Sequence, residues 1–150
     1  MSLKVPPPIW LLLALVSMAL VSHYAPLGYF DFSLKNAVVI AICFIGSIPG
    51  FSAVYLFSKA KTTLDPRNPK QTSQLVTSGI YQFTRNPMYL SLALYLLAAA
   101  IYSGTYSPFL VLPVFIGLIS YLQIAPEEEV LRAMFGQEYS EYCKKVRRWC

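Results

Sequence analysis

The sequence predicts an all-α integral-membrane protein of about four transmembrane helices. Of its 150 residues, 56% are hydrophobic and only 13% are charged, a balance too apolar for a water-soluble domain of this size. A helix needs roughly 20 mostly apolar residues to cross a bilayer. The stretches that approach this length are Pro8 to Tyr24, Lys35 to Phe57, Pro87 to Ser103 and Pro108 to Gln123, and none contains an acidic residue. We expect one membrane domain over residues 1–150.

The first stretch resembles a secretory signal, because Lys4 precedes an apolar run that ends in small residues. The following "SHYAPLGYF" is a poor cleavage site and three more apolar stretches come after it, so we interpret it as a retained helix. The second stretch contains "GSIPG" at 46–50. Pro49 lacks a backbone donor there and is expected to kink the helix.

The third stretch follows Arg85, Asn86 and Pro87. Asparagine is favoured at the N-cap and proline at the first helical position, so the helix is predicted to begin here. The short "YSGTYS" predicts a tight hairpin into the fourth stretch. After the fourth stretch, apolar residues recur at spacings of three and four, which predicts amphipathic helices interrupted near Gly136. The basic C-terminal end with Trp149 suits the headgroup layer of the membrane.

The positive charges predict the orientation. Five of the twelve Lys and Arg residues lie in 59–85 and five follow the last apolar stretch. By the positive-inside rule, both termini and the central loop face the cytoplasm. The net charge of +5 is then explained by topology and by anionic lipid headgroups, so nucleic acid is not needed as a partner. The three cysteines have no paired spacing, which predicts neither a disulfide framework nor a metal site.

Two polar segments could carry chemistry. The start of the third helix could bind an anion, because its first N–H groups have no partner within the helix and the helix dipole adds positive charge. The alternative is an ordinary helix cap followed by no ligand, with Arg85 extending its charged end to the membrane surface. "PEEEV" at 126–130 is either an acidic first helical turn or a source of a carboxylate for the bundle. Successive helical residues point about 100° apart, so at most one or two glutamates can face inward, and Glu127 is the one we expect.

Taken together, "LVTSGIYQFTRNPMYLS", the hairpin and "PEEEVLRAMFGQEYSEYCKKV" resemble the C-terminal catalytic region of the isoprenylcysteine carboxyl methyltransferase family. That family belongs to a wider set of integral-membrane methyltransferases that includes phospholipid N-methyltransferases. The resemblance covers about residues 55–149. It implies an S-adenosylmethionine pocket open to the cytosol, a lipid-like or amphiphilic acceptor that enters from the bilayer, and direct in-line methyl transfer. We expect the two polar segments to enclose a nucleoside-sized chamber.

The resemblance also implies the site residues. Those expected to contact the cofactor are Ser73, Gln74, Leu75, Val76, Tyr81, Asn86, Pro87, Met88, Tyr89 and Glu127. Many family members have histidine where Asn86 stands, and asparagine cannot carry a proton. The arginine that carboxyl methyltransferases use near their substrate aligns with Gln123, which argues against a carboxylate acceptor such as prenylcysteine. No residue is assigned as a catalytic base, and His23, the one histidine, lies on the opposite side.

Two other functions fit parts of the pattern. Membrane sterol reductases share a related C-terminal arrangement with a similar "YC" pair, here Tyr142 and Cys143, and use NADPH. The basic residues available for its 2′-phosphate are Arg147 and Arg148. The other function is that of a non-enzymatic four-helix scaffold or transporter, in which the glutamates and Asn86–Pro87 would only cap helices.

Overall fold

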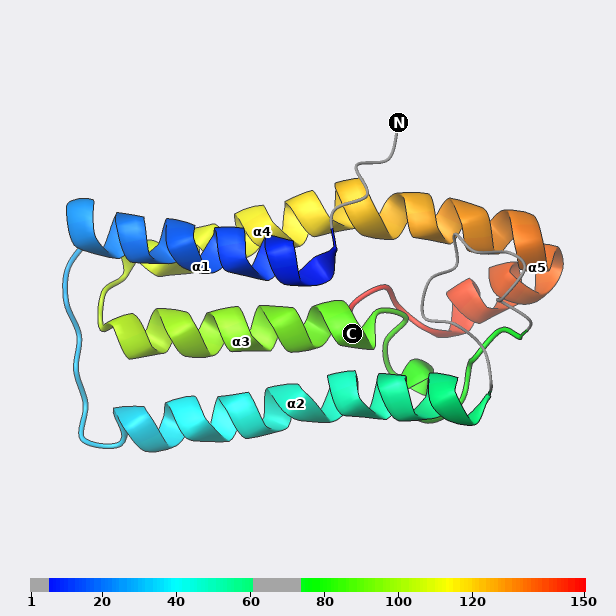
Figure 1. Cartoon of the computed structure of the whole chain (residues 1–150), viewed down its shortest axis with the longest axis horizontal. Coiled ribbons are helices and arrows are strands. Elements are labelled where there is room, and N and C mark those ends of the chain that lie inside the picture. The colour runs from blue at the N-terminus through cyan, green and yellow to red at the C-terminus, as the bar shows by residue number, and fades with distance from the viewer. Residues whose placement is uncertain (1–5, 61–73) are drawn as a thin grey trace.

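The computed structural model describes residues 6–60 and 74–150, and it places four helical segments side by side with successive segments antiparallel (Figure 1). The first three are α1 (Pro7–Tyr24), α2 (Lys35–Lys59) and α3 (Pro87–Ser103). The fourth comprises a 3₁₀ turn (Ser107–Leu110), α4 (Val111–Ile119), a π-helical turn (Ser120–Ile124) and α5 (Ala125–Lys145). A further 3₁₀ turn (Gly79–Gln82) precedes α3. The prediction of an all-α membrane fold is confirmed.

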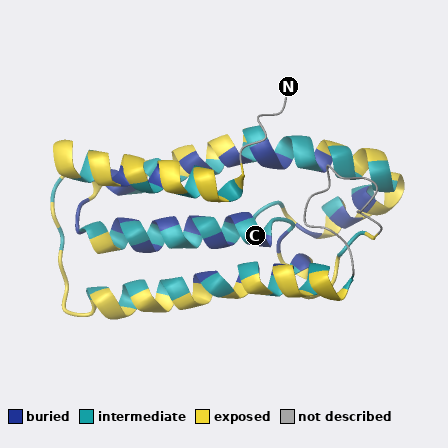
Figure 2. Ribbon diagram, in the orientation of Figure 1, coloured by how far each residue is buried: buried dark blue, intermediate teal, exposed yellow. Residues whose placement is uncertain are grey.

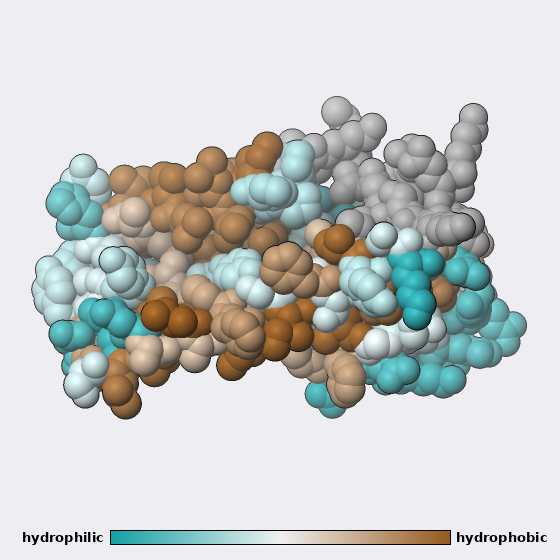
Figure 3. Space-filling view, turned by 60° about the horizontal axis from the view of Figure 1, so that its bottom comes forward, coloured by the Kyte–Doolittle hydropathy of each residue, from teal (hydrophilic) through white to brown (hydrophobic). Residues whose placement is uncertain are grey.

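Among residues 6–60 and 74–150, three segments are long and apolar enough to cross a membrane, namely α1, α2 and the segment Ser107–Lys145, while α3 is a shorter apolar helix. Large apolar side chains are exposed on the outer faces of α1 and α2, as a bilayer requires. On the face shown in Figure 3, hydrophobic residues lie along the helices, and the most hydrophilic residues gather towards the two ends. Both the composition and the apolar surface of the chain are therefore those of an integral-membrane protein.

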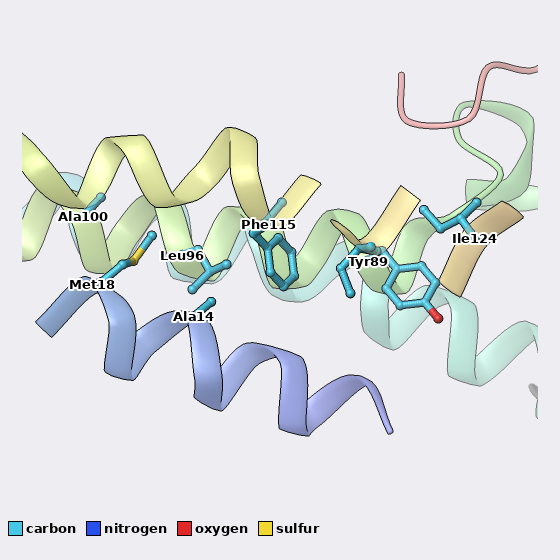
Figure 4. Close-up of a cluster of buried hydrophobic side chains, with 9 residues drawn as sticks. Ala14, Met18, Tyr89, Leu96, Ala100, Phe115 and Ile124 are labelled. Carbon is cyan, nitrogen blue, oxygen red and sulfur yellow. The ribbon is translucent and has the colours of Figure 1, made fainter. Parts of the chain in front are cut away.

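α3 is the central helix, because it contacts α1, α2 and α4. Its residues are mostly buried or half-buried, whereas α1 and α2 expose their outer faces (Figure 2). The core between α1, α3 and α4 combines small residues with larger ones, including Ala14, Leu96, Ala100 and Phe115 (Figure 4). Small residues let helix backbones approach closely where no hydrophobic effect drives association.

Glycine allows α2 to pack closely on α3. A Cβ atom added at Gly46 would lie 2.9 Å from the Cβ of Leu94. At the next position of each helix, the hydroxyl groups of Ser47 and Tyr95 form a hydrogen bond of 2.8 Å between the two helices. The helix continues through the buried Pro49 to Lys59, so this proline does not end it.

The predicted hairpin between α3 and the last helix is confirmed. Gly104 follows α3 in the left-handed conformation, with φ of 69°. Its carbonyl accepts a hydrogen bond from the Phe30 N–H at 2.9 Å, which joins the two connecting loops at this end of the bundle. The left-handed conformation carries no steric penalty for glycine.

The last helix carries "PEEEV" at the start of α5, with Glu127 and Glu128 in its first turn, as one of the two interpretations predicted. The helical segment that begins at Ser107 reaches these residues without a break and runs through them to the non-helical Gly136. Pro126 lacks an N–H, and its ring would clash with the carbonyl of Leu122 four residues earlier in a regular α-helix. The π-helical turn at Ser120–Ile124 widens the backbone at this point.

The predicted interruption near Gly136 is confirmed. Gly136 has φ of 51° and ψ of −117°, and the chain reverses there, so that the end of α5 runs back towards the end of α2 (Figure 1). Ala53 of α2 then packs with Tyr139 and Tyr142 of α5 in a second apolar cluster, which also contains Tyr81 and Val146. This reversal brings distant segments together at one end of the bundle.

Candidate functional site

The candidate site lies where the start of α3, the Gly79–Gln82 turn and the start of α5 meet. Pro87 is the first residue of α3, as predicted, and its ring is buried. Two residues later, the buried Tyr89 donates a hydrogen bond from its hydroxyl group to Glu127 Oε1 at 2.9 Å. Tyr89 also belongs to the apolar core between α1, α3 and α4, at the same end of that core as Ile124 (Figure 4). The two polar segments expected to meet are therefore in direct contact.

Tyr81 is held in the same region by its backbone and its ring. Its carbonyl accepts a 2.7 Å hydrogen bond from the Tyr142 hydroxyl, and its ring packs edge-on against Phe57 at 5.6 Å between centroids. Burial raises the pKa of the Tyr81 phenol, and the charges of Tyr142 and Glu127 raise it further. Both effects favour the neutral form of the Tyr81 phenol.

Glu128 corrects the expectation that Glu127 would be the glutamate turned most deeply inward. Glu128 is the buried residue, with 6% exposure, whereas Glu127 is half-buried and Glu129 is exposed. Its oxygens accept hydrogen bonds from Arg85 Nη2 at 2.8 Å and from Arg148 Nη2 at 2.6 Å. We call these three residues the ion cluster. Burial of a carboxylate is tolerated here because two cations compensate its charge.

Arg85 is consequently not a snorkelling side chain. Its side chain is 12% exposed, and the guanidinium group also donates from Nη1 to the carbonyl of Cys143 at 3.3 Å. The signal that could have found the ion cluster was the arginine beside a membrane helix, because such a charge needs a partner. That partner lies 43 residues away in the sequence, beyond any local pattern.

Asn86 occupies the predicted N-cap position, but its side chain does not cap α3. Its amide donates instead to the carbonyl of Arg148 at 2.9 Å, while its own N–H donates to Thr84 Oγ1 at 3.1 Å. The expectation of a side-chain cap was wrong, because the chain after α5 returns to this point. The carbonyl of Arg148 then binds the Asn86 side chain, which does not cap the helix.

Residues 146–149, which we call the tail segment, run beside the start of α3. The Arg148 guanidinium makes two hydrogen bonds to Glu128, and these raise its pKa above the ordinary value. Trp149 packs against the core of the bundle and donates from its indole nitrogen to Ser120 Oγ at 3.1 Å. Trp149 is therefore held against the bundle, and its place in the headgroup layer stays a prediction.

The remaining expected residues are spread around this centre. Leu75, Val76 and Met88 pack against the cluster that contains Tyr81. Gln74 is exposed, and Ser73 lies outside the described residues. Gln123 is 1% exposed, in the π-helical turn that leads into α5.

The arrangement combines a half-buried carboxylate with two buried phenols. A carboxylate accepts hydrogen bonds from hydroxyl and ammonium groups, and aromatic faces attract cations. Within residues 6–60 and 74–150, no group of three His, Cys, Asp or Glu residues could hold a metal ion. The site therefore suits a ligand that carries positive charge and hydroxyl groups.

Comparisons with known proteins show the family of the chain. A family model described as phospholipid methyltransferase matches residues 34–138, which include α2, α3, α4 and the ion-cluster residues Arg85 and Glu128. The chain is 48% identical over 62 residues to an uncharacterized protein of Haemophilus influenzae, a match that covers 41% of this chain and 98% of that protein.

A second relative has a described activity. The chain is 25% identical over 117 residues to a protein-S-isoprenylcysteine O-methyltransferase of Schizosaccharomyces pombe. This match covers 78% of the chain but only 50% of the yeast protein, so the chain spans about half of that relative's length. No solved structure matches the chain significantly.

Proposed function

Because this chain belongs to the phospholipid methyltransferase family, we propose that it is a membrane methyltransferase that uses S-adenosylmethionine and acts on a lipid-like or amphiphilic acceptor. The observation that carries the proposal is the hydrogen bond between Tyr89 and Glu127 at one end of a membrane bundle, near enough to Tyr81 for the Glu127 charge to raise the pKa of its phenol. These three come from three separate segments. Each is a residue that the family resemblance implies for the cofactor.

The chemistry of these residues fits S-adenosylmethionine. Its sulfonium and ammonium groups are cations, which suit aromatic faces and a carboxylate, and its ribose hydroxyl groups are donors for Glu127. The hydrogen bond from Tyr89 orients the Glu127 carboxylate before any ligand arrives. Asn86, Pro87 and Met88 form the start of α3, where the helix dipole favours the carboxylate of the donor. Ser73, Gln74, Leu75 and Val76 are proposed to complete the site from the segment before the 3₁₀ turn.

The protein's contribution is alignment and exclusion of water. When bound, S-adenosylmethionine supplies an already activated methyl group for direct in-line transfer to a nucleophile. Holding two reactants in line contributes up to about 7–11 kcal/mol in intramolecular analogues, and the buried surroundings of Tyr81 and Tyr89 keep water away. Tyr81 stays neutral, so a base is not part of the proposal, and an amine acceptor must arrive deprotonated.

The acceptor class is narrowed by Gln123. The yeast relative is named as a methyltransferase of isoprenylcysteine, whereas here a buried glutamine stands where the resemblance places the substrate arginine. The two arginines of the ion cluster are paired with Glu128 and do not replace it. We propose an acceptor with a carboxyl, amine or thiol nucleophile, with prenylcysteine disfavoured. Changing Gln123→Arg should raise activity on a prenylcysteine analogue, and unchanged acceptor preference would remove Gln123 from the acceptor site.

We also propose that the site and both termini face the cytoplasm. The start of α1, the end of α2 and the start of α3 lie at the same end of the bundle as α5 (Figure 1). The sequence concentrates its Lys and Arg residues in the segments at this end. The positive-inside rule then supports this orientation.

Calorimetric titration of the purified protein in detergent tests the donor. We expect binding of S-adenosylmethionine and of its demethylated product, and none of NADPH. Glu127→Gln should weaken binding at least about tenfold, as loss of a charged hydrogen-bond acceptor does. Glu129→Gln is the matched control, because Glu129 is exposed two residues away. Binding of NADPH instead, or equal donor affinity in Glu127→Gln, would contradict the proposal.

A further inference from the structure

The tail segment is fixed to the start of α3 through its backbone. The Arg85 N–H donates to the carbonyl of Arg147 at 3.1 Å. Thr84 Oγ1 and Asn86 Nδ2 donate to the carbonyl of Arg148 at 3.3 and 2.9 Å. Because two consecutive carbonyls are held, the tail segment has one register, and the Arg148 side chain leaves it at a fixed point.

From that point, Arg148 holds Glu128 with a two-pronged contact. Its Nε lies 3.1 Å from Glu128 Oε1 and its Nη2 lies 2.6 Å from Oε2. Arg85 holds Oε1 from the other side at 2.8 Å. Paired hydrogen bonds between a guanidinium and a carboxylate fix direction as well as distance. The Glu128 side chain is 8% exposed and the Arg148 side chain is 38% exposed, so solvent screens this contact in part.

Holding Glu128 also fixes Glu127. The two are successive residues of α5, about 100° apart around the helix axis, so the rotation that brings Glu128 to Arg148 directs Glu127 to the Tyr89 hydroxyl. The π-helical turn immediately before α5 has a less regular backbone than an α-helix. The start of α5 therefore needs an outside contact to set its rotation.

The other end of the tail segment reaches the π-helical turn itself. Trp149 donates to Ser120, the first residue of that turn, and its ring packs against the bundle core. The tail segment thus contacts the first residue of the turn through Trp149 and the helix after the turn through Arg148. It bridges the irregular part of the backbone.

We propose that the tail segment completes the cofactor site, with Arg148 as a positioning residue that aims Glu127 at the methyl donor through Glu128. This inference rests on the proposed function, because it assigns a role toward the same ligand. The ion cluster and the Trp149 contact together act as a brace for the start of α5.

The test uses the full chain in detergent and titration with S-adenosylmethionine. Arg148→Gln should weaken donor binding roughly tenfold, within the range that misplacing a site residue produces, and Arg148→Lys should recover part of the loss because it keeps the charge. Lys145→Gln is the matched control, since this exposed residue also carries one positive charge near the end of α5. It should bind like the unaltered chain.

Combining Arg148→Gln with Glu127→Gln separates positioning from general stability. If Arg148 acts through Glu127, its removal should cost little further affinity once Glu127 has lost its charge. A full and additive loss in the double variant would overturn the positioning role. Equal affinity of Arg148→Gln and the unaltered chain would overturn it as well, while leaving the proposed function intact.

If Arg148→Gln does not yield folded protein, Trp149→Phe carries the test. This change keeps an aromatic ring in the core and removes the donor to Ser120. We expect a few-fold loss of donor affinity, and no loss would contradict the brace. Failure of the unaltered chain to bind the donor is a different result, because it overturns the proposed function itself.

Discussion

At the scale of single residues, the site depends on which glutamate faces which partner. Glu127 accepts from Tyr89, Glu128 is enclosed by two arginines, and Glu129 is exposed. Three like residues in a row thus have three different environments, because a helix turns each one by about 100°. The consequence is that each can be changed separately, with its neighbours as controls.

Tyr89→Phe tests the orientation of Glu127. The change keeps the buried ring and removes the hydroxyl that donates to Glu127 Oε1. Loss of one such hydrogen bond costs about 1 kcal/mol, or about a fivefold weaker affinity for S-adenosylmethionine in a titration. Tyr95→Phe is the control, because its hydroxyl pairs with Ser47 between α2 and α3. Equal effects of the two changes would show that the Tyr89 hydroxyl has no particular role at the site.

The sequence predicted part of this site and missed the rest for a physical reason. Tyr81, Tyr89 and Glu127 were implied by motifs that lie within short stretches of sequence. Arg85, 43 residues away, meets Glu128 through the hairpin that follows α3, and Arg148, 20 residues away, meets it only after Gly136 reverses the chain. Asn86 was placed at the correct cap position, but the destination of its amide depends on Arg148, which no local preference specifies.

At the scale of helices, close packing of α2 on α3 depends on the missing side chain of Gly46. Gly46→Ala would place a methyl group 2.9 Å from Leu94 Cβ, which moves only with its backbone. We expect a loss of stability of about 1–3 kcal/mol, measured by unfolding in detergent. Gly117→Ala is the control, since an added Cβ there meets nothing within 4 Å. Equal stability of the two variants would contradict the packing described for Gly46.

Gly136 determines the reversal within α5. Its φ of 51° and ψ of −117° are unfavourable for residues with a side chain, although an added Cβ would meet no atom within 4 Å. Gly136→Ala should therefore destabilise the fold by about 1–3 kcal/mol through backbone strain alone. A thermal unfolding curve in detergent measures this loss. An unchanged midpoint would mean that the reversal tolerates an ordinary residue.

Helix boundaries were predictable where the signal was local. Pro87 and Gly104 bound α3 as expected, and Gly136 interrupts α5 as expected. The π-helical turn was not predicted, because it arises from Pro126 inside a helix that continues, whereas a proline before three glutamates also fits the start of a new helix. Whether the proline starts a new helix or lies inside a continuing one depends on tertiary packing.

At the scale of the whole molecule, the antiparallel bundle and the reversed end of α5 perform different tasks. The bundle places apolar surface towards the bilayer, with α3 enclosed by its neighbours. The reversed end returns the chain to the start of α3, where the tail segment and the ion cluster hold the start of α5. Membership of the phospholipid methyltransferase family rests on a match over residues 34–138, which covers α2 to α4 and ends just after the reversal at Gly136.

The most direct test of the account is transfer of a labelled methyl group in native membranes. Membranes that contain the full chain are incubated with S-adenosylmethionine labelled in its methyl group, and the label in the extracted lipids and other amphiphiles is measured. We predict incorporation with the unaltered chain and with Glu129→Gln, and its near-complete loss with Glu127→Gln. No incorporation above that of membranes lacking the chain, or equal incorporation by Glu127→Gln, would contradict the account.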